Sequence, residues 1–598
     1  MTATHRRHLP FGAELIAPDR ARFRLWGPSC SAVSLLLDER APIAMQRDAD
    51  GWFALDAACV AGTRYRFGVT MAESGETITV PDPASRAQDG GVHGASIVVD
   101  PHAYRWQHDA WRGRPWHEAV FYELHVGIAG GFAGVGQRLP ALAALGVTAI
   151  ELMPVGEFPG PRNWGYDGVL PFASASAYGT PDELKALIDS AHGLGLMVFL
   201  DVVYNHFGPE GNFVGVYADD FFRDDIATPW GRAIDFRRPG VRDFYCENAL
   251  YWLMEYRFDG LRLDATHSIV PQDWLFDLAS CVRDTVDPPR HVHLVLEHEG
   301  NAAHLLTRGD PLGFPYAAQW NDDGHHALHV LLTGETDGYY IDYASAPADK
   351  LARCLAEGFI YQGQPSVFRG GQSRGEPSKD LPTTAFVLFL QNHDQIGNRA
   401  FGERLTTLAD PHALFAASAL VLLCPQIPLL FMGEQWGATE PFLYFASYSD
   451  VALAEAVRLG RRNEFADKVA DAIPDPNDPS SFARSVPIAS RSRAAKRWLL
   501  HTRALLATRH AHIIPRLVGT RSLGAEGVGP AAVVARWHMG DGAVLTIASN
   551  LAASEVSIAP HRFPLRGDVL FATGGTDPST HRESLPAHTT WALLGSAA

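Results

Sequence analysis

The chain has little cysteine and no excess of basic charge, and both shortages exclude classes of protein. Its 598 residues include six cysteines without a Cys-x-x-Cys or metal-type spacing, which fits a reducing compartment better than a disulfide framework. The formal net charge is −17, whereas a nucleic-acid partner would favour a basic patch. A neutral partner such as a sugar is compatible with this charge.

The chain also lacks a recognisable signal peptide and an uninterrupted membrane span. Residues 1–10 carry arginines without an apolar run behind them. The most apolar stretch, Leu414 to Met432, approaches membrane-spanning length but contains Pro425 and Pro428. A helix followed by a buried strand explains this stretch better. We therefore expect no membrane partner and a cytoplasmic location.

The sequence pattern divides the chain into three parts, as expected because its length exceeds what one hydrophobic core supports. Residues 1–105 contain short runs such as Arg22–Trp26 and Val33–Leu37 between turn signals, which predicts an immunoglobulin-like β-sandwich. Residues 106–516 alternate between strand and helix patterns. Residues 517–598 return to short strands, which predicts a small C-terminal β-domain.

The middle part predicts an α/β fold, a (β/α)8 or TIM barrel. One helix is especially well marked, since Thr180 suits the N-cap, Pro181 the first turn and Glu183 the third position of a capping box. Strands buried on both faces read as continuous apolar runs, and eight of them alternating with helices indicate a barrel. The strand candidates are Val120–Val126, Ala149–Val155, Met197–Val203, Gly260–Ala265, His293–His298, Ala317–Trp320, Ala385–Gln391 and Pro428–Gly433.

Three acidic residues, Asp264, Glu297 and Asp394, each follow an apolar strand candidate. The C-terminal ends of barrel strands form the active face, and two carboxylates flanking a bond are the usual machinery of glycoside hydrolysis. Arg262 precedes Asp264 by two positions on the same face of the strand, which keeps that carboxylate ionised and suits a nucleophile. Glu297 directly follows an apolar run, and we expect a partly apolar setting that suits a proton donor.

Each of these motifs alone also has a structural explanation. The arginine–aspartate neighbours could form a structural ion pair, Glu297 could face solvent, and Glu299 competes with it. Asp201–His206 and His393–Asp394 end two further strands, and four polar strand ends on one face favour an active site. Asn163–Asp167 adds aromatic rings that suit the flat C–H faces of sugars, although such rings also anchor loops.

Four segments of the chain resemble the signature regions of the α-amylase family of glycoside hydrolases. They are residues 201–206, 260–267, 294–297 and 389–394. The resemblance implies that Asp264 is the nucleophile, Glu297 the general acid and base, and Asp394 a carboxylate that stabilises the transition state. It also implies that the sugar being cleaved contacts four further side chains, namely Tyr166, His206, Arg262 and His393.

Along nearly its whole length the chain is similar to members of that family that release trehalose from maltooligosyltrehalose. Asn163–Phe172, Val203–Asn212 and Pro474–Pro479 carry this similarity. It implies cleavage of the α-1,4 bond next to the terminal trehalose, and a functional partner in the synthase that makes this substrate. Weaker candidates for holding the trehalose side are His267, Asn321, Asp322 and His325.

The chain departs from the family pattern at the loop His125–Phe132 and at Ala446–Tyr448, and both departures bear on recognition of the trehalose end. Two other functions stay open. A 1,4-α-glucan branching enzyme has the same architecture and carboxylates but transfers the glucosyl unit to a sugar hydroxyl. A non-catalytic glucan-binding protein would have no use for a nucleophile and acid pair.

The proposed chemistry requires no cofactor. Asn205 matches one position of the structural calcium sites found in many amylases. Calcium takes roughly 6–8 oxygen ligands, and no further ligand set accompanies this asparagine. We therefore predict no metal.

Overall fold

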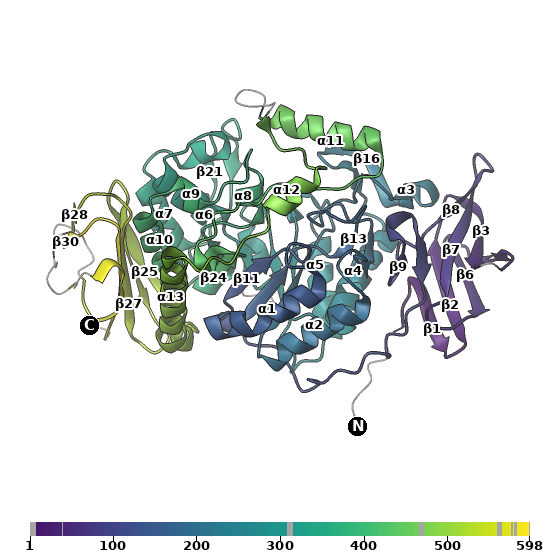
Figure 1. Cartoon of the computed structure of the whole chain (residues 1–598), viewed down its shortest axis with the longest axis horizontal. Coiled ribbons are helices and arrows are strands. Elements are labelled where there is room, and N and C mark those ends of the chain that lie inside the picture. Colours follow the sequence, from purple (N-terminus) through teal and green to yellow (C-terminus); the bar gives the residue numbers. More distant parts are fainter. Residues whose placement is uncertain are drawn as a thin grey trace.

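The computed structural model describes residues 8–38, 40–307, 315–465, 472–558, 565–575, 578 and 583–596. It has three parts in chain order. Figure 1 shows the N-terminal sheets and the C-terminal sheet at opposite ends of a central barrel. The fold class predicted from the sequence is confirmed, whereas the residue limits of the three domains stay predictions.

The N-terminal part is a sandwich of two sheets. One has the strand order β1-β2-β6-β5, and the other has the order β4-β3-β7-β10-β9 with β8 paired to β7. The rings of Phe23 and Tyr65, from the two sheets, lie 5.0 Å apart between centroids in the shared core. The strands are β1 (Gly12–Ala17), β2 (Arg20–Trp26), β3 (Cys30–Leu37), β4 (Ile43–Ala44), β5 (Gln46–Arg47), β6 (Trp52–Ala58), β7 (Arg64–Met71), β8 (Thr77–Val80), β9 (Gln88–Asp89) and β10 (Ala95–Ile97).

The central part is a closed barrel whose strand pairs are all parallel. All eight predicted strands are present, and seven of them end one to three residues earlier than predicted. The strands are β11 (Phe121–Leu124), β12 (Ala149–Leu152), β15 (Met197–Val202), β18 (Gly260–Leu263), β19 (His293–Leu296), β20 (Ala318–Trp320), β23 (Phe386–Phe389) and β24 (Ile427–Phe431).

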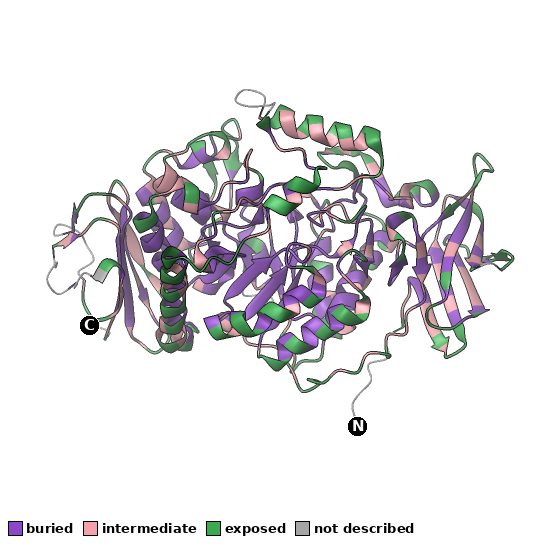
Figure 2. Cartoon of the chain, in the orientation of Figure 1, coloured by how far each residue is buried: buried purple, intermediate pink, exposed green. Residues whose placement is uncertain are grey.

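Helices surround the barrel, and Figure 2 shows buried strands inside helices whose outer faces are exposed. The longer helices are α1 (Gly131–Leu145), α2 (Pro181–Gly193), α4 (Pro239–Met254), α5 (Trp274–Thr285), α6 (Asp322–Thr333), α7 (Pro347–Glu357), α10 (Pro411–Leu423), α11 (Val451–Glu464) and α13 (Arg493–Thr508). The shorter ones are α3 (Val214–Tyr217), α8 (His393–Gly397), α9 (Leu405–Leu408) and α12 (Pro479–Arg484).

Loops on the barrel carry three short hairpins that bear on the site. They pair β13 (Gly156–Glu157) with β14 (Leu170–Ser174), β16 (Phe222–Thr228) with β17 (Gly231–Ile234), and β21 (Gln364–Pro365) with β22 (Ser373–Arg374).

The long apolar stretch predicted as a helix and a buried strand is α10 followed by β24. Both elements are almost entirely buried, which explains their apolar composition without a membrane. Across the described ranges, no helix combines the length and the apolarity that a membrane crossing requires.

The C-terminal part contains a sheet in the order β25-β26-β27-β31-β29 and a small pair, β28 with β30. It docks on the barrel's helices. Thr590 donates to the carbonyl oxygen of Ala416 on α10 at 2.8 Å, and the Trp537 indole donates to the carbonyl oxygen of Leu355 on α7 at 3.3 Å. The strands are β25 (Arg521–Gly529), β26 (Ala532–His538), β27 (Val544–Asn550), β28 (Val556–Ser557), β29 (Asp568–Ala572), β30 (Ser584–Leu585) and β31 (Thr589–Gly595).

The capping box predicted for the second barrel helix is confirmed at the start of α2. The Thr180 hydroxyl accepts from the Glu183 backbone N–H at 3.2 Å, and the Glu183 carboxylate accepts from the Thr180 backbone N–H at 2.7 Å. Two of the N–H groups that a helix start leaves without partners are thereby satisfied.

Thr180→Ala should lower the free energy of unfolding by about 1 kcal/mol, because it removes the acceptor at the N-cap. Thr180→Ser keeps a hydroxyl at the same position and is the matched control. Its free energy of unfolding should change by only a few tenths of that amount. Urea unfolding followed by far-UV circular dichroism measures both variants. Equal midpoints for the alanine and serine variants would contradict the capping role.

Candidate active site

The barrel interior changes from apolar to acidic towards the C-terminal ends of its strands. Phe121, Ala149, Phe199 and Val295 belong to the apolar cluster inside the barrel. Because residues two apart on a strand face the same side, the next interior residues on these strands are acids. They are Glu123, Glu151, Asp201 and Glu297. The alternation of the strands therefore gathers carboxyl groups at one end of the barrel.

Arg262 on β18 is the centre of this group. Its Nη1 donates to both oxygens of Asp201, at 2.9 and 2.8 Å, and to Oδ1 of Asp264 at 2.7 Å. Its Nη2 donates to Oε2 of Glu297 at 2.9 Å. The guanidinium is fully buried and lies 4.3 Å from the ring centroid of Trp320. One cation therefore joins the predicted nucleophile and the predicted acid.

Asp264 and Glu297 both retain access to solvent, with 11% and 20% of their side chains exposed. The second oxygen of Asp264 accepts from the Asn205 amide at 3.4 Å. Glu297 Oε2 also accepts from the backbone N–H of Ala265 at 2.8 Å, and Ala265 adopts a left-handed conformation with φ of 40°. The prediction of a partly apolar setting for Glu297 is wrong in this respect, because two donors converge on one of its oxygens.

His393 supplies the second buried cation of the site. It donates to the carboxylate of Glu123 through Nδ1, contacts the Tyr166 hydroxyl through Nε2 at 2.6 Å, and lies 3.4 Å from Oδ2 of Asp394. Burial alone disfavours a charged imidazole, but the charges of Asp394 and Glu123 outweigh it and raise the pKa of His393 to about 10. His393 is therefore an imidazolium at neutral pH, beside the third predicted carboxylate.

Tyr166 and His206 contact the residues around this group of carboxylates. The Tyr166 hydroxyl donates to Oδ2 of Asp201 at 2.6 Å, and its ring stacks on His393 with 5.1 Å between centroids. His206 contacts the backbone oxygen of Tyr166 at 3.0 Å, and burial lowers its pKa to about 4. His206 is therefore neutral, and its other ring nitrogen, Nδ1, contacts the side-chain oxygen of Asn205 at 2.8 Å.

Asp322 and His267 lie at the edge of the same site. Asp322 accepts from the Gln395 amide at 3.3 Å, and burial, followed by the negative charge of Glu297, raises its pKa to about 8. A protonated Asp322 would donate a hydrogen bond beside the catalytic carboxylates. His267 is further out, 3.4 Å from the half-exposed carboxylate of Glu299. Glu297, and not Glu299, is the acid held by Arg262.

Asn321 and His325 have to be corrected as substrate-binding candidates. The Asn321 amide is fully buried, caps α6 by accepting from the Gly324 N–H, and donates to the carbonyl oxygen of Gly358 at 3.0 Å. His325 contacts the carbonyl oxygen of Leu390 at 2.6 Å and the Tyr340 hydroxyl at 3.2 Å. Their polar atoms hold neighbouring segments, so the structure gives them packing roles.

The sequence reasoning missed several residues that shape the site. Glu123 and Glu151 lie inside strands. The strand alternation, which places them two residues after the interior residues Phe121 and Ala149, could have identified them. Glu151 is buried, neither of its oxygens bonds to any residue that the structure describes, and burial raises its pKa well above the usual value. Burial therefore favours the neutral form of the Glu151 carboxyl group.

Exposed aromatic rings next to the site were also missed. Trp230, in the turn between β16 and β17, is 42% exposed and stacks on His206 with 4.9 Å between centroids. Phe368, between β21 and β22, is 52% exposed and packs edge-on against Tyr339. Isolated aromatic residues in long insertions have no periodic signal, so no sequence pattern distinguishes these two rings.

The two departures from the family pattern have definite positions. The Tyr448 hydroxyl donates to Asp167 at 2.7 Å, and Asp167 accepts in turn from the Asn163 amide at 2.6 Å. In the other loop, His125 contacts the backbone oxygen of Asn163 at 2.8 Å. Residues at both departures therefore contact the Asn163–Asp167 segment, which carries Tyr166.

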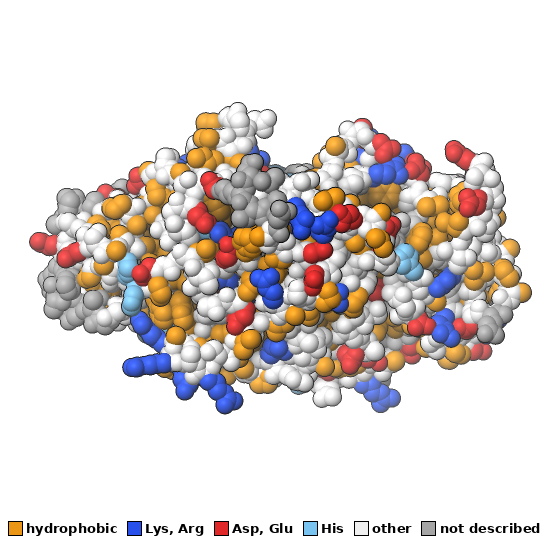
Figure 3. Space-filling model, turned by 45° about the horizontal axis from the view of Figure 1, so that its top comes forward, with side chains coloured by type: hydrophobic (Ala, Val, Ile, Leu, Met, Phe, Trp, Pro, Cys, Tyr) orange, Lys and Arg blue, Asp and Glu red, His pale blue; other side chains and the backbone are white. Residues whose placement is uncertain are grey.

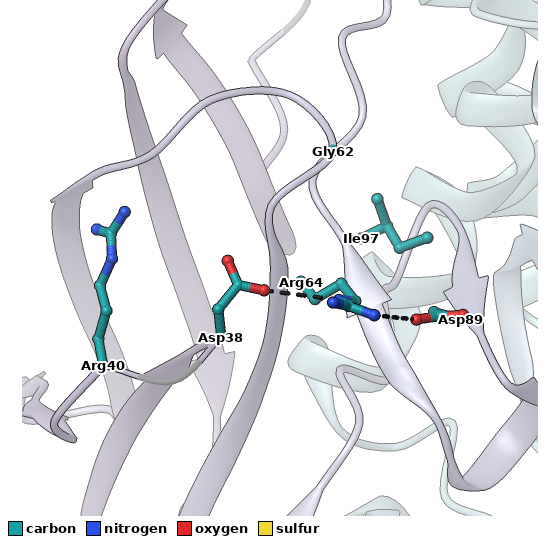
Figure 4. A pocket seen from close by; sticks show the side chains of 6 residues that line it. All are labelled: Asp38, Arg40, Gly62, Arg64, Asp89 and Ile97. Atoms are coloured by element: carbon teal, nitrogen blue, oxygen red, sulfur yellow. Dashed lines mark hydrogen bonds and ion pairs between the residues drawn. The ribbon is translucent and has the colours of Figure 1, made fainter.

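No trio of His, Cys, Asp or Glu side chains suited to a metal ion occurs in the described ranges. A shallow hollow of about 820 Å³ lies on the N-terminal sandwich, where Arg64 pairs with Asp89 at 2.8 Å and with Asp38 at 3.6 Å (Figure 4). It belongs to a different domain from the carboxylates. On the face shown in Figure 3, acidic and basic side chains are interspersed, unlike the single-sign surface that nucleic acid favours.

Comparison with known proteins agrees with this geometry. A family model described as the catalytic domain of alpha amylase matches residues 97–224, and one described as a domain of unknown function, DUF3459, matches residues 520–590. The crystal structure of a proposed alpha amylase from Salmonella typhimurium superposes with a TM-score of 0.92 at 44% identity, covering 98% of this chain and all of that one. Fold and site together define a glycosidase of the α-amylase type.

Two curated relatives bear on which family of α-amylase-type glycosidases the chain belongs to. The malto-oligosyltrehalose trehalohydrolase of Saccharolobus solfataricus is 41% identical over 76% of this chain and 80% of its own length. The 1,4-alpha-glucan branching enzyme of Photobacterium profundum is 34% identical over 46% of this chain and 43% of its own length. The chain belongs to the malto-oligosyltrehalose trehalohydrolase family.

Arg262→Lys should lower kcat/KM at least ~100-fold, because an ammonium cannot reproduce the planar fork that serves Asp264 and Glu297 together. Arg242→Lys is the matched control. Arg242 also pairs with two carboxylates, Asp273 and Asp277, but between outer helices. Steady-state kinetics on a glucan substrate, with thermal unfolding to verify folding, measures both. Similar losses in the two variants would refute a specific role for Arg262.

Glu123→Gln and Glu151→Gln form a second comparison, because the two residues are paired in register on adjacent strands. Glu151→Gln should keep kcat within about threefold, since an amide resembles a neutral carboxylic acid. Glu123→Gln should lower kcat more than ~10-fold, because it removes the negative partner of His393. Both values come from initial rates at saturating substrate. A large loss for Glu151→Gln would show that its charge is required.

Proposed function

We propose that this protein is a retaining glycosidase that cleaves the α-1,4 bond next to the terminal trehalose of maltooligosyltrehalose. The observation that carries the proposal is the division of one buried guanidinium between Asp264 and Glu297. Retaining enzymes need their two carboxyl groups about 5–5.5 Å apart, without space for a water between them. Asp264 and Glu297 bind the two terminal nitrogens of one rigid guanidinium, which supports such a close placement.

In the first step, Glu297 protonates the glycosidic oxygen while Asp264 attacks the anomeric carbon. The bond to the trehalose unit breaks, trehalose leaves, and a covalent glycosyl–enzyme forms. The bonds from Arg262 and Asn205 fix the orientation of Asp264 for this attack.

In the second step, the deprotonated Glu297 removes a proton from water, and the water oxygen displaces Asp264 from the anomeric carbon. Two displacements restore the original configuration of the sugar. Asp394 lies beside the His393 imidazolium and stabilises the positive charge that develops on the sugar ring in both steps. Tyr166, His206 and His393 line the subsite of the sugar being cleaved.

The substrate assignment is supported by the relatives and by the rim of the site. Two exposed aromatic side chains, Trp230 and Phe368, can offer flat apolar faces to sugar rings. Asp322 and His267 supply polar contacts at the trehalose end. We infer that a synthase provides the substrate and that both enzymes act in the cytoplasm.

A branching enzyme is the second candidate, since the curated branching enzyme of Photobacterium profundum shares sequence over less than half of this chain. The two functions differ in whether water or a sugar hydroxyl attacks the glycosyl–enzyme. Incubation with maltotriosyltrehalose should release trehalose and maltotriose, with the new reducing end first observed as the α-anomer by proton NMR. Incubation with amylose should leave its iodine stain unchanged in wavelength. Failure to release trehalose, together with a shifted stain, would favour branching.

Asp264→Asn should abolish trehalose release, with kcat lowered at least ~10⁴-fold, because the amide cannot form the covalent intermediate. Asp394→Asn should lower kcat by ~10²-fold or more with little change in substrate Kd, because its charge matters chiefly in the transition state. Initial rates by chromatography and Kd by calorimetry separate the two effects. Near-normal kcat in either variant would contradict the assigned role.

A further inference from the structure

Two cysteines lie opposite each other on neighbouring outer helices of the barrel. Arg242 on α4 donates to the carboxylate of Asp277 on α5. Cys246 and Cys281 follow these two residues by four positions each, which is one helical turn further along the same faces. The packing of the helices therefore places the two thiols against each other, and Cys246 forms a side-chain hydrogen bond with Cys281.

Exposure distinguishes this pair from the other cysteines. Cys246 and Cys281 are both partly exposed, whereas the remaining four cysteines are buried. All six residues are thiols in this structure. Among the buried ones, Cys354 and Cys424 are near enough for the charge of one to affect the other. The chain therefore contains one accessible pair and one inaccessible pair.

We propose that Cys246 and Cys281 form a redox site that closes to a disulfide by exchange with a small-molecule disulfide such as oxidised glutathione. Nothing in the glycosidase chemistry uses these residues. The bond would tie α4 to α5 and close a loop of chain that contains β18, the strand that carries Arg262.

The contact between the two thiols bears on the order of the proposed reaction. The side-chain hydrogen bond with Cys281 raises the pKa of Cys246, and burial raises it further. In the proposed reaction we therefore assign the first attack to Cys281. Its thiolate bonds to one sulfur of glutathione disulfide, the S–S bond breaks, and one glutathione thiolate leaves.

Cys246 then loses its proton and attacks the Cys281 sulfur in this mixed disulfide, which releases the second glutathione. The two protein thiols are oxidised by two electrons, and glutathione disulfide is reduced to two glutathione thiols. The two protons from the protein thiols are taken up by the released glutathione thiolates, so the exchange is balanced.

Incubation of the whole protein with oxidised glutathione should remove two of its six thiols, as counted by thiol titration after denaturation. Peptide mapping should find a peptide containing Cys246 joined to one containing Cys281, and dithiothreitol should reverse it. Because the cross-link restricts the unfolded chain, we expect the thermal midpoint to rise by ~3 °C. Cys354 and Cys424 serve as an internal control that should keep both thiols.

Single variants test the order of attack. In Cys246→Ala, one glutathione should remain attached to Cys281, and in Cys281→Ala, Cys246 should stay largely unmodified. A wild-type protein that keeps all six thiols would overturn the proposal. So would a cross-link between other cysteines, or a wild-type protein that accumulates bound glutathione without forming the bridge.

Discussion

The site depends on one buried guanidinium. Arg262 is fully enclosed, and its nitrogens are shared among Asp201, Asp264 and Glu297. Burying an ion costs several kcal/mol, and only close, well-oriented counter-charges offset that cost. The arginine therefore requires the carboxylates as much as they require it. Loss of one partner from such a buried pair typically costs about 3–5 kcal/mol.

A second cation, His393, allows the barrel to hold more acids than Arg262 alone could neutralise. It faces Glu123 on one side and Asp394 on the other. The remaining interior acids carry less charge, because burial raises the pKa of Asp201 to about 7 and that of Glu151 well above its usual value. Protonation thus limits the repulsion among carboxyl groups on neighbouring strands, while Asp264 and Glu297 keep their contacts with Arg262.

The parts of this arrangement that were predictable from the sequence are those governed by local rules. The eight strands follow from apolar runs, the α2 cap from Thr180 and Glu183, and the Arg262–Asp264 contact from strand alternation. Asn321 and His325 were misassigned because tertiary packing decides where their polar atoms point. Their residue types suit sugar binding, but the Asn321 side chain caps α6 and the His325 ring contacts the carbonyl oxygen of Leu390.

The geometry around Arg262 also bears on the proposed double displacement. Nη1 serves Asp264 and Nη2 serves Glu297, and these nitrogens belong to one planar group of fixed dimensions. In the proposed double displacement neither carboxyl group has to leave Arg262. Movement of Asp264 or Glu297 away from Arg262 would leave a buried positive charge under-neutralised. The interaction that stabilises this end of the barrel therefore also opposes movement of the two proposed catalytic groups.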